Sequence, residues 1–374
     1  MNFDFSDDQK ELREQAKRFL KDKCPPKTVR AILDGGDSYD RALWKSVAEM
    51  GWTATAIPEE YGGLGLGYLE LCVIAEELGN AVAPIPFASS VYLATEAILV
   101  AGSEEQKQKY LPKLASGELI GTFATSEGAN AATPKTIKTT FKGGKLDGKK
   151  EPVADGANAD IAIVLVRTGD SGERSLSLAI VDLKASGVTV ENLRTFDPTR
   201  NQAAVTFAGA PAEALGATGE GWDLTRQILD RAAILLAFEQ VGGSDACLAM
   251  AKDYALNRYA FGRQIASYQA IKHKLADMYV NTEIARSNAY YAAWALATGA
   301  AELPEAAAGA RIAATQAYDY ASRENLQTHG GMGYTWELDC QLYYRRAKND
   351  GLALGAQRVW KEKLVTQLER KNAA

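Results

Sequence analysis

The sequence has few of the side chains that bind metals or cross-link secreted proteins. Its 374 residues include only two histidines, His273 and His329. Four cysteines are present, and no two of them form a CxxC pair: Cys24, Cys72, Cys247 and Cys340. This content argues against a zinc site and does not indicate a disulfide framework. We therefore expect no metal, reduced cysteines that pack in the core, and a structural or exposed His329.

The chain also lacks an excess of positive charge. The chain has 42 Lys and Arg against 47 Asp and Glu, which gives a net charge of −5 and a pI near 5.4. Without a basic surplus to neutralise phosphates, a nucleic-acid partner is disfavoured. The chain carries charge within its first seven residues, so we expect no signal peptide. No apolar run is as long as a membrane span, so we expect a cytoplasmic protein that does not bind membranes.

The residues that are present predict a helical segment at the start. Apolar residues make up 47% of the chain and charged residues 24%, as in ordinary globular proteins. Ser6 followed by Gln9 is typical of a capping box, and residues 104–115 predict a short amphipathic helix that contains a proline. We expect a loop over residues 58–67, where glycines cluster. Residues 1–118 are therefore predicted to form an N-terminal α domain.

The pattern changes at about residue 119 and again at about residue 222. Runs of β-branched residues at 161–166, 177–183, 188–193 and 203–207 predict strands. From residue 222 onward, stretches of 20 to 30 residues lack glycine and proline, which predicts long helices. These helices are expected over 222–241, 268–298, 305–328 and 352–371. The fold is therefore predicted to be α+β, with a mostly antiparallel β domain at 119–221 and a C-terminal four-helix bundle at 222–374.

Three segments resemble one known family. They are IPEEYGGLGLGYLELCVIAEELG at 57–79, RYAFGRQIASYQAIKHKLADM at 258–278 and QTHGGMGYTWE at 327–337. In this order and spacing they resemble the acyl-CoA dehydrogenases, and the likeness covers essentially the whole chain. The resemblance implies a helical N-terminal domain, a β domain and a C-terminal four-helix bundle. It also implies bound FAD and a homodimer, homotetramer or two-chain heterotetramer, because family members complete each FAD site with a neighbouring subunit.

The resemblance assigns cofactor roles to particular residues. Arg258 has a planar set of donors suited to a diphosphate, and Gln269 would hold the adenosine end. Bare backbone at Gly330 and Gly331 would allow a close approach to the FAD of another subunit. The full expected set is Ser126, Arg258, Phe261, Gln269, Gln327, Gly330 and Gly331. Each also has a structural interpretation, such as a solvated Arg258, a core Phe261 or a helix C-cap at the two glycines.

Two stretches depart from the family pattern around the flavin. The family usually has a Thr-Glu-Pro turn against the ring, and the matching stretch here is FATSEGANAA, which lacks the proline. Ser126 can still offer a hydroxyl, and Glu127 is kept. The tryptophan that commonly covers the flavin falls near Pro152. We therefore expect FAD to bind in an altered environment.

The larger departure concerns the catalytic base. The family reaction removes a proton next to the thioester while a hydride leaves the next carbon for flavin N5, so a positioned carboxylate is needed. The two usual positions of this base fall on Leu354 and Ala232, and neither side chain accepts a proton. Glu239, in the apolar segment AAILLAFEQVGG, is the first candidate for the base; its alternative role is an ion pair with an arginine. Asp350 is a second candidate, with a helix-start role as its alternative.

Three functions remain open from the sequence. The first is α,β-dehydrogenation of an acyl-CoA in fatty acid or steroid side-chain β-oxidation, with Glu239 as the base and an electron-transferring flavoprotein as the acceptor. The second is a non-catalytic or half-active FAD-binding subunit of a two-chain acyl-CoA dehydrogenase. The third is a helical binding protein that keeps the fold without FAD.

Overall fold

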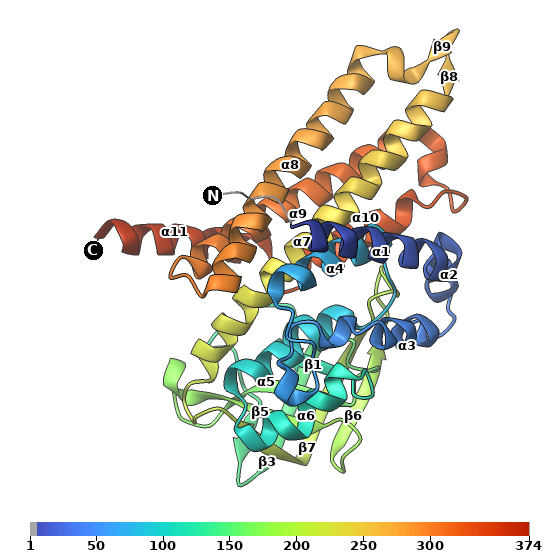
Figure 1. The fold of residues 1–374 in the computed structure, drawn as a ribbon. Coiled ribbons are helices and arrows are strands. Elements are labelled where there is room, and N and C mark those ends of the chain that lie inside the picture. Colours follow the sequence, from blue (N-terminus) through green and yellow to red (C-terminus); the bar gives the residue numbers. More distant parts are fainter. Residues whose placement is uncertain (1–5, 374) are drawn as a thin grey trace. The chain divides into compact units, whose positions relative to one another are not determined.

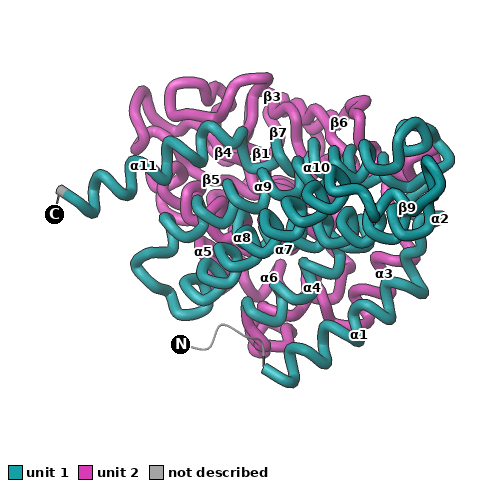
Figure 2. The backbone as a smooth tube through the Cα atoms, turned by 90° about the horizontal axis from the view of Figure 1, so that it is seen from above, with its two compact units in different colours: residues 1–31, 68–83, 233–374 teal, residues 32–67, 84–232 magenta. Residues whose placement is uncertain are grey.

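A computed structural model describes residues 6–373 of the chain. The chain divides into two compact units (Figure 2). The first unit, called the helical unit here, combines the chain up to Ala31 with Tyr68–Ala83 and Ala233–Ala374. The second, called the sheet unit, combines Ile32–Gly67 with Pro84–Ala232. The fold is the expected α+β architecture, with an N-terminal helical region, a middle β region and a C-terminal helical region (Figure 1).

Helices occupy both ends of the chain. The α-helices are α1 (Asp7–Lys23), α2 (Pro26–Leu33), α3 (Arg41–Glu49), α4 (Tyr68–Asn80), α5 (Glu96–Ala101), α6 (Glu104–Ala115), α7 (Gly221–Asn257), α8 (Gln269–Thr298), α9 (Leu303–Thr328), α10 (Cys340–Leu352) and α11 (Gln357–Ala373). Short 3-10 and π segments are η1 (Trp52–Ala54), η2 (Glu59–Tyr61), η3 (Ala88–Thr95), η4 (Glu173–Ser175), η5 (Ile265–Ser267) and η6 (Gly330–Tyr334). The predicted capping box is confirmed, since Ser6 Oγ accepts from the Gln9 amide at 3.2 Å and Gln9 Oε1 accepts from the Ser6 amide.

The last predicted helix needs correction. The sequence predicts a helix near 352–371, but the helix found there, α11, begins only at Gln357, after a turn that follows α10. Leu354 and Gly355 adopt positive φ angles of 59° and 98°, which a continuous helix does not allow. The C-terminal helical region therefore contains α10 in addition to the four predicted helices.

The sheet unit is built on seven strands. They are β1 (Gly121–Ala124), β2 (Thr140–Lys142), β3 (Lys145–Ala154), β4 (Ile161–Arg167), β5 (Leu176–Asp182), β6 (Val188–Leu193) and β7 (Gln202–Leu215). Pairings β4–β2, β2–β3, β3–β7, β7–β5 and β5–β4 close a ring, with β1 beside β4 and β6 beside β7. Most pairings are antiparallel, as predicted; β1–β4 and β2–β4 are parallel. Strands β4 and β5 are buried along almost their whole length, which explains their continuous apolar sequences.

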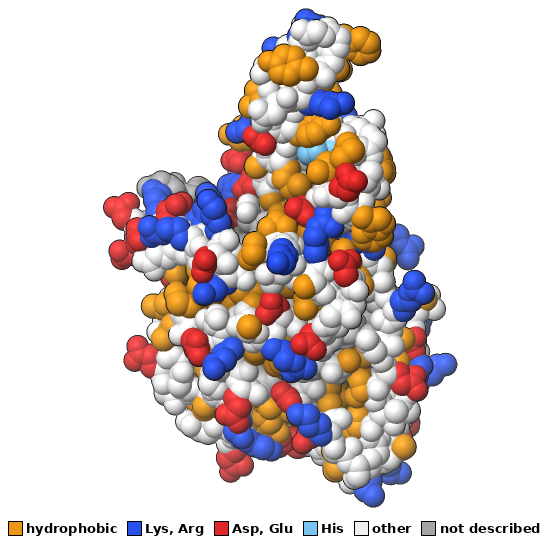
Figure 3. Space-filling model, turned by 90° about the vertical axis from the view of Figure 1, so that its right-hand side faces the viewer, with side chains coloured by type: hydrophobic (Ala, Val, Ile, Leu, Met, Phe, Trp, Pro, Cys, Tyr) orange, Lys and Arg blue, Asp and Glu red, His pale blue; other side chains and the backbone are white. Residues whose placement is uncertain are grey.

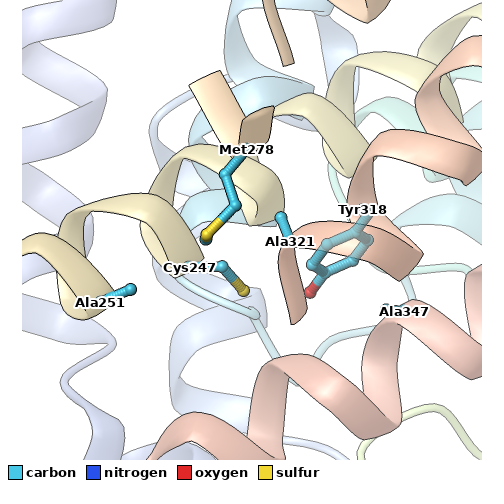
Figure 4. Packing of buried hydrophobic residues seen from close by; sticks show 6 residues of the cluster. All are labelled: Cys247, Ala251, Met278, Tyr318, Ala321 and Ala347. Atoms are coloured by element: carbon cyan, nitrogen blue, oxygen red, sulfur yellow. The ribbon is translucent and has the colours of Figure 1, made fainter. Parts of the chain in front are cut away.

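The core of the helical unit lies where α7, α8, α9 and α10 meet. Six buried side chains from these helices form one cluster (Figure 4). They are Cys247, Ala251, Met278, Tyr318, Ala321 and Ala347. The four cysteines of the chain are free and buried, as predicted. By length and composition α7 could cross a membrane, but 78% of its most apolar window is buried, as expected of a core helix.

A network of charges joins α1, α4, α7 and α8 within the helical unit. Glu76 of α4 is almost fully buried, and it accepts from Arg13 of α1 at 2.6 Å and from Arg286 of α8. Arg286 also donates to Asp245 of α7. Burial raises the pKa of Glu76, and the two arginines oppose that rise. Because each buried charge here has partners of opposite sign, the helices can approach closely without an uncompensated charge.

Candidate functional site

The first predicted cofactor motif forms a hairpin between α7 and α8. Short strands β8 (Tyr259–Ala260) and β9 (Arg263–Gln264) pair, which leaves Phe261 and Gly262 at the tip. Both tip residues have positive φ, at 52° and 81°, and the Phe261 ring is 97% exposed. The Arg258 side chain, at the start of the hairpin, is exposed and forms no ion pair or hydrogen bond with residues 6–373. Gln269 follows as the first residue of α8 and is also exposed.

The second motif lies at the end of α9 and in η6. Gln327 is exposed, and its Oε1 accepts a long hydrogen bond of 3.4 Å from the Tyr334 hydroxyl. Gly330 has a φ of 60°, and a Cβ placed on Gly330 or Gly331 would meet nothing within 4 Å. Their backbone thus faces open space that a ligand can approach.

Two contacts bring these motifs side by side in the helical unit. The ring of Tyr254, one turn before Arg258 in α7, lies 4.2 Å from the ring of His329, which directly precedes Gly330. His329 is buried, and its Nδ1 lies 2.9 Å from the Asn325 carbonyl oxygen, so of the two predicted roles the exposed one is wrong and the structural one agrees with the structure. An ion pair of 2.8 Å between Lys274 of α8 and Glu324 of α9 adds a second link. The six residues that the two motifs contribute therefore belong to neighbouring segments.

Large apolar side chains are exposed around the two motifs. Figure 3 shows hydrophobic side chains at its upper end, where α7 and α8 meet the hairpin. The exposed large apolar residues of α7, α8, the hairpin and residues 330–336 are Leu256, Tyr259, Phe261, Tyr279, Val280, Ile284, Tyr291, Met332, Tyr334 and Trp336. Exposed aromatic and aliphatic groups in such numbers are typical of a surface that binds a ligand or another chain.

Ser126, the remaining predicted cofactor residue, lies in the sheet unit on the turn after β1. It is half-buried, and its hydroxyl makes no hydrogen bond with any residue that the structure describes. Within the sheet unit the Ser126 hydroxyl is free to bond a ligand, and within the helical unit Arg258 offers guanidinium donors beside two open glycines. These residues fit FAD by their chemistry.

The candidate base, Glu239, lies in α7 in a buried ion pair. Its carboxylate Oε1 is 3.5 Å from Nη1 of Arg346 in α10, and the two side chains are 1% and 0% exposed. The Arg346 guanidinium also donates to the carbonyls of Val82 and Ala83 at 3.5 Å. A Cβ on Gly79 would lie 1.9 Å from the Glu239 carbonyl oxygen, so only glycine permits α4 to approach α7 here. Glu239 therefore has the arginine partner that its alternative role predicts.

The two positions at which the family usually carries its base, Ala232 and Leu354, lie in a buried helix and in a turn. Ala232 is fully buried in α7. Leu354 lies in the turn between α10 and α11, where its carbonyl accepts from Trp360 Nε1 at 3.1 Å. The buried Arg311 of α9 donates to the carbonyls of Asp350 and, at 2.7 Å, Ala353. Burial lowers the pKa of Arg311 to about 10. The turn is therefore held firmly although it carries no carboxylate at residue 354.

The helix-start role considered for Asp350 is wrong. Asp350 lies near the C-terminal end of α10, which begins at Cys340, and it is 2% exposed. Sequence reasoning also missed Arg346 and Lys150, which is 0% exposed in β3. Both stand in runs of basic residues, RRAK and GKKE, that look like solvated surface. Their side chains are nevertheless 0% exposed and pair with Glu239 and Glu127, which lie 107 and 23 residues away in the sequence.

Comparisons with known proteins agree with this architecture. Residues 6–118 match the family model of the acyl-CoA dehydrogenase N-terminal domain, and residues 219–368 match that of the C-terminal domain. The acyl-CoA dehydrogenase IpdE2 of Mycobacterium tuberculosis is 32% identical over 358 residues, which cover 96% of each chain.

Solved structures give the same result. Butyryl-CoA dehydrogenase from Megasphaera elsdenii superposes with a TM-score of 0.92 at 27% identity, covering 98% of this chain and 100% of the other. A variant of the Tcur3481-Tcur3483 steroid ACAD gives a TM-score of 0.87 at 28% identity, covering 98% and 99%. The family relatives are oxidoreductases, and membership implies a flavin cofactor and an acyl-CoA substrate. With both terminal domains matched and relatives aligned from end to end, the chain belongs to the acyl-CoA dehydrogenase family.

Proposed function

We propose that this chain is an FAD-binding subunit that takes part in α,β-dehydrogenation of an acyl-CoA thioester in the cytoplasm. The observation that carries the proposal is the preserved cofactor framework, with an unpaired Arg258 and open backbone at Gly330 and Gly331. Arg258 would bind the diphosphate and Gln269 the adenosine end. Phe261, Gln327 and the glycines would meet FAD at a subunit boundary, and Ser126 would meet the ring. When bound, FAD supplies the hydride acceptor for the substrate's β carbon.

The choice of proton acceptor divides this proposal into two forms. In the first, Glu239 is the base, as predicted from the sequence. To accept a proton, Glu239 would have to leave the Arg346 cation buried without its counter-charge, which is costly. In the second form the carboxylate comes from a different chain, because Ala232 and Leu354 provide none. The ion pair favours the second form, a two-chain enzyme whose partner carries the base.

The relatives suggest a substrate class to test first. One matched structure is named as a steroid ACAD, and its name joins two designations, Tcur3481 and Tcur3483. We propose that a steroid-derived acyl-CoA is the substrate of the complete enzyme. We further propose an electron-transferring flavoprotein as its electron acceptor.

An anaerobic titration tests both forms. The purified chain, alone and with the product of a neighbouring gene, would be titrated with steroid and straight-chain acyl-CoAs while flavin absorbance is followed. The two-chain form expects a yellow single chain that does not bleach and a pair that does. Bleaching by the single chain, lost in Glu239→Gln while FAD stays bound, would instead establish Glu239 as the base. A chain that remains colourless with excess FAD, alone and with the partner, would leave only the FAD-free binding protein.

A further inference from the structure

The turn that carries Ser126 is held from both sides by the backbone of β3. The Glu151 amide donates to the Ser126 carbonyl at 2.9 Å, and the Gly128 amide donates to the Glu151 carbonyl at 2.6 Å. Glu127 and Glu151 also form an isolated parallel bridge. These bonds fix the path of the backbone through the turn, but they do not reach the residue before Ser126.

A buried lysine supplies the remaining contacts. Lys150 of β3 is 0% exposed, and its Nζ donates to Glu127 Oε1 at 2.7 Å and to the Thr125 carbonyl at 3.3 Å. The ammonium group therefore binds the residues on either side of Ser126. Glu127 in turn accepts from the amides of Lys138, at 2.7 Å, and Thr139, at 3.0 Å. The Glu127 carboxylate thus connects the turn to residues 138 and 139, which lead into β2.

The buried Lys150–Glu127 ion pair contributes little to the free energy of unfolding, so its value must lie in the geometry that it imposes. Burial of an ammonium group in a β unit is unfavourable, and an apolar pair of similar volume is often as stable as a buried ion pair. Burial lowers the pKa of Lys150 to about 8, although Glu127 opposes that shift. Burial alone would raise the pKa of Glu127, but Lys150 and the Thr139 amide hold it below its usual range. What an apolar pair could not replace is the set of directional bonds from Lys150 to the Thr125 carbonyl and from the Lys138 and Thr139 amides to Glu127.

We propose that Lys150 is a positioning residue for the flavin, because it fixes the turn that presents the Ser126 hydroxyl. This inference rests on the proposed function, in which Ser126 meets the flavin ring. Lys150 acts through Thr125 and Glu127 and does not itself touch the cofactor. The Ser126 hydroxyl is unengaged by the described residues, so it can donate to or accept from a ligand once the turn is fixed.

The test compares Lys150→Met with Lys149→Met in the full chain, using FAD as the probe. Lys149 is the adjacent residue on the same strand, but its side chain is half exposed and pairs with Glu151 at 2.5 Å. Lys150→Met is expected to weaken FAD binding about tenfold and to shift the visible flavin bands, whereas Lys149→Met leaves both unchanged. In the FAD-free protein, Lys150→Met should also speed hydrogen exchange at the amides of Lys138 and Thr139.

A double variant separates positioning from stability. Lys150→Met combined with Glu127→Leu removes both buried charges and is expected to recover thermal stability, yet FAD binding and flavin bands should stay altered. Wild-type affinity and bands in the double variant, or in a folded Lys150→Met protein, would overturn the proposal. A wild-type chain that binds no FAD, alone or with its partner, is a different result, because it refutes the proposed function and this inference with it.

Discussion

Alanine at Gly330 should weaken FAD binding without costing more stability than alanine at Gly299. The two glycines are a matched pair in the structure. Their φ angles are 60° and 62°, and a Cβ at either position would meet nothing within 4 Å. Gly299 ends α8, whereas Gly330 belongs to the second cofactor motif. A single methyl group can therefore probe the cofactor surface while the backbone strain is kept equal.

The expected magnitudes follow from this geometry. A non-glycine residue in the left-handed region costs about 1–2 kcal/mol, and no steric clash adds to it at either site. In a unit of this size, that loss lowers the melting temperature by about 2–8 °C. In Gly330→Ala, the added methyl group would in addition occupy the space through which FAD is proposed to approach the backbone. A tenfold loss of FAD affinity corresponds to about 1.4 kcal/mol and is the smallest effect expected.

The assay has two arms. Thermal unfolding of the FAD-free proteins measures the strain, and quenching of flavin fluorescence on titration measures FAD affinity. Gly299→Ala and Gly330→Ala should melt alike, but only Gly330→Ala should bind FAD more weakly. Equal FAD affinity in the two variants would refute the assignment of Gly330 to the cofactor surface. Unequal melting of the apo-proteins would refute the claim that their strain is matched.

Three further predictions concern buried charge and the usual base turn. Arg346→Met should destabilise the protein by about 3–5 kcal/mol, because it leaves the buried Glu239 carboxylate without its counter-charge. Adding Glu239→Leu should recover most of this loss in thermal unfolding. Additive losses from the two substitutions would contradict the coupling. Burial and the neighbouring Glu76 raise the pKa of Glu77 to about 7, so its contribution to stability is complete below about pH 4.5 and is lost as pH rises through 7. Glu77→Gln should therefore lose less melting temperature than wild type between pH 5 and pH 8, and parallel curves would contradict this. Leu354→Glu should give the FAD-loaded single chain some acyl-CoA-dependent bleaching of the flavin, because hydrogen bonds from Trp360 and Arg311 already hold the turn at residue 354. A folded, yellow variant that never bleaches would argue against residue 354 as a position for the base.

Much of the fold could be predicted because local patterns decide it. The capping box at Ser6 needs only residues three apart, and β4 and β5 are apolar along their length because they are buried along their length. Strand β3 was missed, since its sequence KLDGKKEPVA is charged and contains a glycine and a proline. It is held by its pairing with β7, about 55 residues later at Lys150 and Val205, and the register shifts twice. Such a strand depends on a distant partner and has little local signal.

In the candidate site, too, local motifs can be predicted from sequence, whereas contacts between distant residues cannot. The glycine and arginine motifs are local and could be read directly, whereas the role of Glu239 depends on a residue 107 positions away. Sequence alone could not choose between a base and an ion pair, because an apolar helix segment is compatible with either. Lys150 and Glu127 are a similar case, separated by 23 residues and by a turn whose path is not apparent from composition.

The two buried ion pairs can therefore be told apart by what their bonds hold in place. Arg346 donates to the carbonyls of Val82 and Ala83 and to Glu239, and none of these belongs to a predicted cofactor motif. The bonds of Lys150 and Glu127 instead converge on a turn with an unengaged hydroxyl. Replacing either pair with apolar side chains should change the free energy of unfolding by a similar, small amount. If the pairs have the roles argued for them, only the replacement at Lys150 and Glu127 will change the flavin, and the replacement at Arg346 and Glu239 will leave FAD bound with unaltered bands.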